Sequence, residues 1–329
     1  MVPLLLVLAG LVLLTAGADV LVRGAVRLAR AGGVPPVVIG LTVVAFGTSL
    51  PELVVSVSAA LEGKGGLALG NVVGSNICNV LLILGAAAVV SPLSVAEEVI
   101  RTELPLLVLV SVATLLASLS GRFSRPEGLL FLLGLVGWIY LQVRAARADA
   151  KRRELVRQLA PDAHVEVHEL SPALRRAELL RGAGLTVLGL VALLGGAQLL
   201  VNGAVIVARS FQISELTIGL TLVAVGTSMP ELATSVVAAW RGQGDLAVGN
   251  VIGSSLFNLL GVLGASAAAA SGGVLVPPEA LRFDLPVMLF AAVICWPILR
   301  SGRMVSRAEG AALLVGYGAY TALLFRGAA

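Results

Sequence analysis

Charged residues are scarce in this chain. Of its 329 residues, 13% are Asp, Glu, Lys or Arg and 58% are hydrophobic, whereas a soluble domain carries about 25% charged residues. The deficit runs along the whole length, so we expect most of the chain to lie in lipid. A bilayer span needs about 20 apolar residues, and the apolar stretches suffice for about ten spans.

Cysteine is nearly absent, and the basic residues are not arranged as a nucleic-acid surface. Cys78 and Cys295 both lie in apolar segments without a CxxC spacing, which argues against a disulfide framework or a zinc site. The net charge is +4, yet no basic face with interleaved aromatic residues occurs. The apolar N-terminus also lacks the basic region of a signal peptide, so we interpret residues 1–14 as part of the first span.

One segment of the chain occurs twice. GLTVVAFGTSLPEL at 40–53 returns as GLTLVAVGTSMPEL at 219–232, and GNVVGSNICN at 70–79 returns as GNVIGSSLFN at 249–258. The offset is 179 residues without a gap, and 28 of 46 positions from Gly40 onward are identical. The identities include Gly, Thr, Ser, Pro, Glu and Asn, which chance similarity between apolar helices does not explain. The pattern indicates an internal duplication of the kind found in transporters.

The apolar stretches predict an all-α membrane protein with ten transmembrane helices in two inverted five-helix repeats. Five spans per repeat require the second copy to enter the membrane from the opposite side. The repeats would occupy residues 1–145 and 182–329, joined by a linker at 146–181. The expected spans are 2–22, 34–61, 67–90, 104–120, 127–144, 182–208, 214–240, 246–269, 285–300 and 305–325.

The polar stretch between the repeats, 144–181, holds nine Lys and Arg and both histidines. Alternation of His164, Glu166 and His168 would suit a regulatory metal, while a solvated linker explains the same composition. Basic residues favour the cytoplasmic side. Placing this linker inside puts 17 of the 23 Lys and Arg on the cytoplasmic face and the N-terminus outside, as expected for a multi-pass protein of the cell (inner) membrane.

Two glutamates, Glu52 and Glu231, lie in the middle of apolar segments at matching places in the two copies. A charge at the bilayer centre costs about 2.5–3.5 kcal/mol on insertion scales. The basic residues lie at span ends or in loops, so a mobile cation or a proton is the remaining counter-charge. A pair of protonated carboxyls that packs helices together is the structural alternative.

The residues before each glutamate indicate a broken helix. Gly47 loosens the helix, and Pro51 cannot donate to the carbonyl of Gly47, so backbone carbonyls from 45 to 48 are expected to be free. Thr48, Ser49 and Glu52 lie three and four residues apart and project to one side. Ordinary kinking by Gly and Pro would not account for the accompanying Thr-Ser-x-x-Glu.

The second block opens the next helix. Gly74 and its copy Gly253 permit close helix contact, and Asn71 and its copy are interpreted mainly as caps of broken helix ends. Ser75 and Asn79 share a face. Carboxylate, hydroxyl, amide and carbonyl oxygens suit hard cations such as Na⁺ and Ca²⁺.

The paired GTSxPEL and GNxxGSxxxN blocks resemble the two alpha-repeats of the sodium/calcium exchangers, in the cation/calcium antiporter superfamily. The resemblance covers both repeats and the five-plus-five layout. It implies that two glutamates ligate both ions, that two threonines add calcium ligands, that four serines and two alanine carbonyls bind sodium, and that two asparagines line the centre. These residues are Glu52, Glu231, Thr48, Thr227, Ser49, Ser228, Ser75, Ser254, Ala45, Ala224, Asn79 and Asn258. Some archaeal relatives carry an aspartate at the place of Asn258, so this chain has two central acids rather than three.

A segment with the pattern of another protein class lies at 242–245, where GQGD fits the GxGD signature of intramembrane aspartyl proteases. Such an enzyme needs a second aspartate within a span. Asp19 is the candidate, but it lies near a helix end without the usual tyrosine neighbour, and the first copy reads GKGG here. We interpret the segment as a loop and expect no enzymatic activity.

The function that the sequence predicts is Ca²⁺ extrusion driven by inward Na⁺ flow, by alternating access. A proton-coupled calcium antiporter on the same scaffold is the first alternative, and a cation channel is the second. Two self-contained halves suit a carrier better than a channel. By the resemblance, the glycine-rich first and sixth spans slide over a rigid core. Ca²⁺ and Na⁺ are the expected substrates and membrane lipid the surroundings, with no cofactor, nucleic acid or obligate protein partner.

Overall fold

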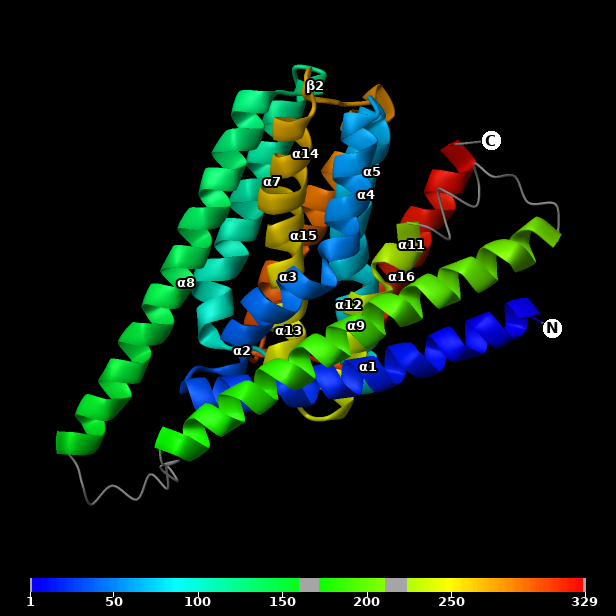
Figure 1. Ribbon diagram of the computed structural model, residues 1–329. Coiled ribbons are helices and arrows are strands. Elements are labelled where there is room, and N and C mark those ends of the chain that lie inside the picture. Colours follow the sequence, from blue (N-terminus) through cyan, green and yellow to red (C-terminus); the bar gives the residue numbers. More distant parts are fainter. Residues whose placement is uncertain (1, 160–171, 211–223, 328–329) are drawn as a thin grey trace.

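The computed structural model describes residues 2–159, 172–210 and 224–327, and these are almost wholly helical (Figure 1). In the first half the elements are α1 (Val2–Gly32), α2 (Pro36–Ile39), η1 (Gly40–Val44), α3 (Ala45–Thr48), α4 (Leu50–Leu61), α5 (Gly65–Ile77), η2 (Cys78–Ile83), α6 (Leu84–Val90), β1 (Leu93–Ser94), η3 (Val99–Glu103), α7 (Leu104–Ser118), β2 (Arg122–Phe123) and α8 (Arg125–Leu159), where η marks a π-helical segment.

The second half follows the same order. Its elements are α9 (Pro172–Ser210), α11 (Ala224–Thr227), α12 (Met229–Trp240), α13 (Gly244–Phe257), η5 (Asn258–Leu263), α14 (Gly264–Ala269), β3 (Val274–Leu275), η6 (Ala280–Asp284), α15 (Leu285–Arg300), β4 (Met304–Val305) and α16 (Arg307–Gly327).

Seven helices in the described part of the chain are long and apolar enough to cross a membrane. An eighth span is formed if the segment Pro36–Thr48 and α4, which meet at a 46° bend, count as one. The protein is therefore an all-helical, multi-pass membrane protein.

Several helices are longer than the sequence predicts. α1 continues to Gly32 rather than residue 22, and α8 and α9 extend into the polar stretch from either side, leaving 160–171 outside the described residues together with His164 and His168. The basic residues that follow an apolar span are themselves good helix formers, so helical hydrogen bonding continues beyond the lipid-compatible part. The predicted linker at 146–181 is thus partly helical.

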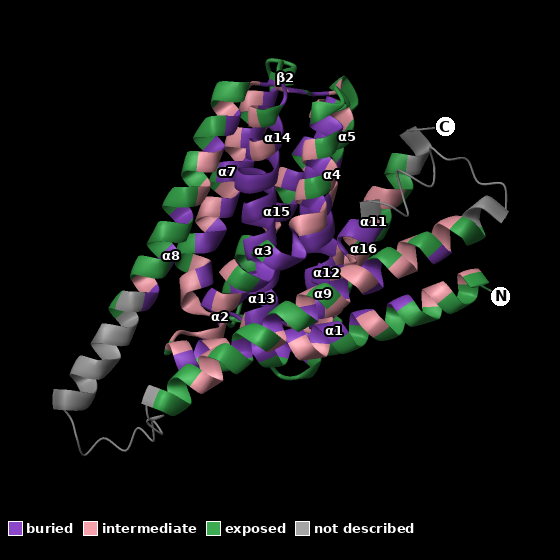
Figure 2. Ribbon diagram, viewed as in Figure 1, coloured by how far each residue is buried: buried purple, intermediate pink, exposed green. Residues whose placement is uncertain are grey.

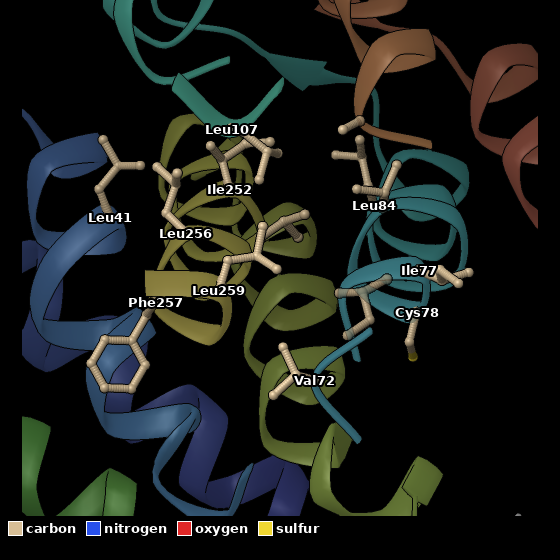
Figure 3. Close-up of a cluster of buried hydrophobic side chains, with 14 of the residues drawn as sticks. Leu41, Val72, Ile77, Cys78, Leu84, Leu107, Ile252, Leu256, Phe257 and Leu259 are labelled. Carbon is tan, nitrogen blue, oxygen red and sulfur yellow. The ribbon is translucent and has the colours of Figure 1, made fainter. Parts of the chain in front are cut away.

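The most buried spans are the two that carry the GNxxGS blocks. Within the apolar window of α13, η5 and α14 every residue is buried, whereas about a fifth of the α9 window is buried. Figure 2 shows buried residues concentrated in the central helices and exposed residues on α1, α8 and α9. Apolar side chains from both halves meet around α13, including Leu41, Leu256 and Leu259 (Figure 3).

Glycines explain how closely the central helices approach. A Cβ added at Gly253 would lie 2.6 Å from the carbonyl oxygen of Leu41, and one added at Gly249 would lie 2.7 Å from that of Val37. Only a residue without a side chain permits this contact between α13 and the second span. The predicted close approach is confirmed at Gly253 but is wrong at Gly74, where an added Cβ would meet no atom within 4 Å.

Two short antiparallel ladders join the halves of the chain. β1 pairs with β4 through Leu93 and Val305, and β2 pairs with β3 through Phe123 and Val274. Each ladder therefore links one strand from the first half to one from the second.

α1 and α9 form an antiparallel pair that runs obliquely across the other helices (Figure 1). A Cβ at Gly10 would lie 2.8 Å from the carbonyl oxygen of Gly196, and one at Gly24 would lie 2.9 Å from that of Gly182. Gly10, Gly17 and Gly24 of α1 are seven residues apart, so each faces α9 two turns after the last, and the two backbones are in contact along this length.

Candidate cation site

The second span breaks where the sequence predicts. α3 ends at Thr48 and α4 begins at Leu50, with Ser49 between them at φ −84° and ψ 9°. Pro51 lies in the first turn of α4, where the missing N–H has no helical partner to lose. Glu52 follows in the same turn, near the positive end of the helix dipole, which favours a carboxylate there.

The second copy has the same local geometry. Ser228, at φ −89° and ψ 6°, separates α11 from α12, and Pro230 and Glu231 lie in the first turn of α12. Ala224 begins α11 at the edge of the described residues. The shared Gly-Thr-Ser-x-Pro-Glu sequence thus produces a break at the same place in both copies, although the serine N–H donates to the carbonyl of Ala45 in the first copy and to that of Val225 in the second.

Two details of the predicted break are different in the structure. The carbonyl oxygen of Ala45 is not free, because it accepts the N–H of Ser49 at 3.0 Å. Gly47 also does more than loosen the helix, since a Cβ there would lie 2.6 Å from the Leu190 side chain of α9. The break is therefore closed by a residual helical hydrogen bond and contacts α9 directly.

The two glutamates are fully buried and are hydrogen-bonded across the halves. Ser49 donates its hydroxyl to Oε1 of Glu231 at 3.0 Å, and Ser228 donates to Oε1 of Glu52 at 3.1 Å. The exposed fraction is 0% for Glu52 and 1% for Glu231. Each carboxylate is thus oriented by the serine at the break of the other half.

Thr48, Thr227 and Ser75 lie beside the two glutamates. Thr48 and Thr227 interact with the carboxyls of Glu231 and Glu52 respectively, again across the halves. The hydroxyl oxygen of Ser75 of α5 lies 3.3 Å from that of Ser228; because Ser228 donates its proton to Glu52, Ser75 is the donor in this contact. The structure therefore brings these predicted residues together around the two carboxylates.

Several oxygens in this region are buried and have no hydrogen-bond partner among the described residues. They are Oε2 of both glutamates, Oδ1 of Asn79 and of Asn258, and the hydroxyl of Ser254. Buried polar atoms nearly always have a partner, so each one without a partner needs an explanation. Each of them can be an electron-pair donor to a hard metal ion.

The amide groups of the two central asparagines have different surroundings. Asn79 donates its Nδ2 to the hydroxyl of Ser255 at 3.4 Å, whereas Nδ2 of Asn258 has no partner in the described structure. Both side chains are only 1% exposed and lie in the first residues of η2 and η5. A π-helical turn redirects the side chains that follow it, which is a frequent feature of functional sites.

Asn71 and Asn250 have a role that differs from the predicted helix caps. Asn71 donates Nδ2 to the hydroxyl of Ser56 at 2.8 Å and to the carbonyl oxygen of Glu52 at 3.3 Å. Asn250 donates in the same way to Ser235 at 2.9 Å and to the carbonyl of Glu231 at 3.4 Å. They hold the glutamate-bearing turns against α5 and α13, one on each side.

Sequence reasoning missed three hydroxyls at this site. Ser56 and Ser235 recur exactly 179 residues apart, so the repeat itself contained the signal for them. Ser255 takes the place of Asn76 of the first copy, and no identity marks it. Its hydrogen bond to Asn79 follows from the packing of α13 against η2.

The acids at this site have no basic partner. Across the described ranges no Lys or Arg is paired with either glutamate, and no group of three or more His, Cys, Asp or Glu is present. Asp19, the second acid of the protease hypothesis, pairs instead with Arg23 at 2.7 Å and with Arg241. Gly242, at φ 69°, lies in the turn between α12 and α13, as the loop interpretation expects.

The fold and the site define a family of membrane exchangers. The chain belongs to the sodium/calcium exchanger protein family, whose profile matches residues 2–144 and 181–326. It is therefore an antiporter of the Na⁺/Ca²⁺ exchanger family, and this family is one of transporters rather than enzymes.

Known proteins are similar to this chain over nearly its full length. The chain is 41% identical to the putative antiporter CaxA of Alkalimonas amylolytica, with 99% of each chain covered. It is 39% identical to the inner membrane protein YrbG of Escherichia coli (strain K12), covering 97% of this chain and 96% of the other. A structure of the sodium-calcium exchanger NCX_Mj superposes with a TM-score of 0.83 at 29% identity, covering 98% of both chains.

Proposed function

We propose that the protein exchanges Na⁺ for Ca²⁺ and that both ions bind between Glu52 and Glu231. The observation that carries this proposal is the pair of buried carboxylates, each with one oxygen hydrogen-bonded across the halves and one without a partner in the described structure. Two negative charges without a basic partner in the described part of the chain favour a cationic substrate, and one Ca²⁺ or two Na⁺ would neutralise them.

The oxygens around the pair would divide between the ions. Thr48 and Thr227 add neutral ligands for Ca²⁺ beside the glutamates, and Asn79 and Asn258 line the centre. Sodium would bind through the serine hydroxyls of both blocks and the carbonyls of the two alanines; these residues are Ser49, Ser75, Ser228, Ser254, Ala45 and Ala224. The Ala45 carbonyl accepts the N–H of Ser49 at 3.0 Å and lies 3.4 Å from the Thr48 hydroxyl. An ion at this carbonyl would replace the threonine contact, because a carbonyl oxygen accepts two bonds and the Thr48 hydroxyl also reaches the Val44 carbonyl at 3.1 Å.

The membrane arrangement that we propose has ten transmembrane helices in two inverted repeats, 1–145 and 182–329. The crossed hydrogen bonds support it, since a pair such as Ser49 with Glu231 has its mirror in Ser228 with Glu52. The N-terminus would lie outside and the 146–181 linker in the cytoplasm, because that arrangement places most basic residues inside.

Alternating access would involve the α1–α9 pair. Leu190 of α9 contacts the break at Gly47, and Val201 of α9 contacts the break at Gly226. At these two breaks the contacts from α9 are made by apolar side chains. Sliding of this pair would open the site to one side of the membrane at a time.

A proton-coupled calcium antiporter is the second candidate. The unpartnered Oε2 of each glutamate supports it, because that oxygen can carry a proton in place of a metal contact. On this alternative two protons would replace the sodium ions.

Calcium uptake into proteoliposomes distinguishes the two candidates. Vesicles containing the purified protein are loaded with Na⁺ or adjusted to an acidic interior, and ⁴⁵Ca²⁺ entry is followed after dilution. We expect uptake to follow the Na⁺ gradient at constant pH. Uptake that follows the pH gradient and ignores Na⁺ would replace sodium exchange by proton exchange, and no uptake in either case would refute both.

A further inference from the structure

A pocket of about 710 Å³ lies outside the cation site, where the C-terminal part of α1 meets the N-terminal part of α9. The turn after α12 closes its third side through Arg241 and Gln243. In Figure 1 these ends lie at the lower edge of the helices, beside the start of α9. This edge is the one that the distribution of basic residues predicts to be cytoplasmic.

Four arginines line the pocket: Arg23, Arg27, Arg30 and Arg241. The side chains of Arg23, Arg27 and Arg241 retain exposed fractions of 58%, 45% and 33%, so their guanidinium groups are accessible from the pocket. A fifth arginine, Arg175, donates its Nε to the carbonyl oxygen of the lining residue Ala31 at 2.8 Å.

Two acids neutralise only part of this charge. Asp19 is shared between Arg23 and Arg241, and Glu178 is shared between Arg27, at 2.8 Å, and Arg181, at 3.5 Å. Each carboxylate thus serves two guanidinium groups. Arg30 has no acidic partner within the described ranges, so the pocket keeps a net positive charge.

The rest of the lining is apolar. Val20, Val22 and Val26 of α1 and Leu185 of α9 form it. A free inorganic anion would use the arginines and leave this surface without a partner. A molecule with a phosphate at one end and hydrocarbon at the other would contact both, as basic pockets between transmembrane helices do with acidic lipid headgroups.

We propose that this pocket binds the phosphate-bearing headgroup of an anionic membrane phospholipid. The guanidinium forks offer paired N–H donors to phosphate oxygens, and the valines contact the start of the acyl chains. Because the lining comes from α1, α9 and the turn after α12, one bound lipid contacts both the α1–α9 pair and the turn that follows the helix carrying Glu231.

The proposal is tested by lipid binding to the full-length protein in detergent, which does not depend on ion exchange. Dioleoyl-phosphatidylglycerol is titrated and bound lipid is counted by native mass spectrometry, with dioleoyl-phosphatidylcholine as the neutral comparison. Arg30→Gln and Arg27→Gln should each weaken phosphatidylglycerol binding about fivefold, as expected for one arginine at an acidic headgroup. Glu178→Gln should tighten binding by a similar factor, because it frees two arginines.

The matched control is Arg282→Gln, an exposed arginine distant in sequence from every lining residue. It removes the same charge and should leave the affinity unchanged. Equal weakening by Arg282→Gln would mean general charge attraction, and no change with Glu178→Gln would mean that the arginines paired with Glu178 do not bind the headgroup; either result would overturn the site. Competition by 10 mM inorganic phosphate as strong as that by the lipid would identify a free anion as the ligand and refute the lipid assignment.

Discussion

The change Glu231→Gln provides the strictest test of the cation site. It keeps the size of the side chain and an oxygen that can accept the Ser49 hydroxyl, which lies 3.0 Å from Oε1 in the native protein. It removes one of the two charges of the site. The fold should therefore persist while the affinity for Ca²⁺ falls.

The magnitude follows from Coulomb's law. Calcium binds oxygen ligands at about 2.3–2.6 Å, so the carboxylate charge lies within about 4 Å of the ion. Two unit charges at about 4 Å interact by about 4 kcal/mol at an effective dielectric constant near 20, and a divalent ion doubles this to about 8 kcal/mol. If desolvation offsets three quarters of it, about 2 kcal/mol remains, which is roughly a thirtyfold loss of affinity.

The measurement combines calcium titration with thermal unfolding in detergent. Native protein should unfold at a higher temperature as Ca²⁺ is added, because a ligand that binds only the folded state stabilises it. In ion-free buffer Glu231→Gln should unfold no earlier than the native protein, since it relieves the repulsion between two buried carboxylates. Its stabilisation by Ca²⁺ should require at least thirtyfold more calcium.

Two comparisons complete the experiment. Glu52→Gln should behave in the same way, because its hydrogen bond to Ser228 is the repeat mate of the one made by Glu231. The exposed Glu279→Gln should change neither curve. Unaltered calcium stabilisation of Glu231→Gln, with normal ⁴⁵Ca²⁺ exchange in vesicles, would show that the ion is not bound between the two glutamates.

Three other predictions concern coupling, topology and the α1–α9 contact. If three Na⁺ exchange for one Ca²⁺, an inside-positive potential should accelerate calcium uptake into Na⁺-loaded vesicles, because one charge in the field is worth about 2.3 kcal/mol per 100 mV; a rate independent of potential would indicate two Na⁺. A cysteine introduced at 151–157 should react with impermeant thiol reagents from the cytoplasm and one replacing Lys64 only from outside, and labelling of both from one side would contradict the inverted repeats. Gly189→Ala places a Cβ 2.5 Å from the backbone nitrogen of Leu21, so it should lower the free energy of unfolding by about 1–3 kcal/mol and slow exchange. The control Gly184→Ala lies on the same helix with open space around the added Cβ and should do neither. Equal effects of the two variants would refute the close contact between α1 and α9.

Much of this protein could be predicted from its sequence. The scarcity of charge required a membrane environment, and the gapless repeat of Thr-Ser-x-Pro-Glu identified two buried acids at matching places. The break at each proline follows from its missing N–H, a local property that no tertiary contact has to supply. The assignment of the roles of individual residues to Ca²⁺ or Na⁺ remains a prediction from resemblance.

Only the tertiary structure decided which residues face one another. The hydroxyl of Ser49 could have bonded to Glu52 in its own half of the chain. It bonds to Glu231 instead, because the helix breaks of the two halves lie next to each other. Asn71 does not cap a helix end, because α5 continues through it. Its amide instead faces the neighbouring helix and donates a hydrogen bond to Ser56. The ends of the helices also could not be predicted from the hydropathy pattern. Hydropathy marks where the lipid-facing part of a helix ends, whereas backbone hydrogen bonding continues past that point. Local chemistry thus determined the elements, and packing between distant segments determined the site.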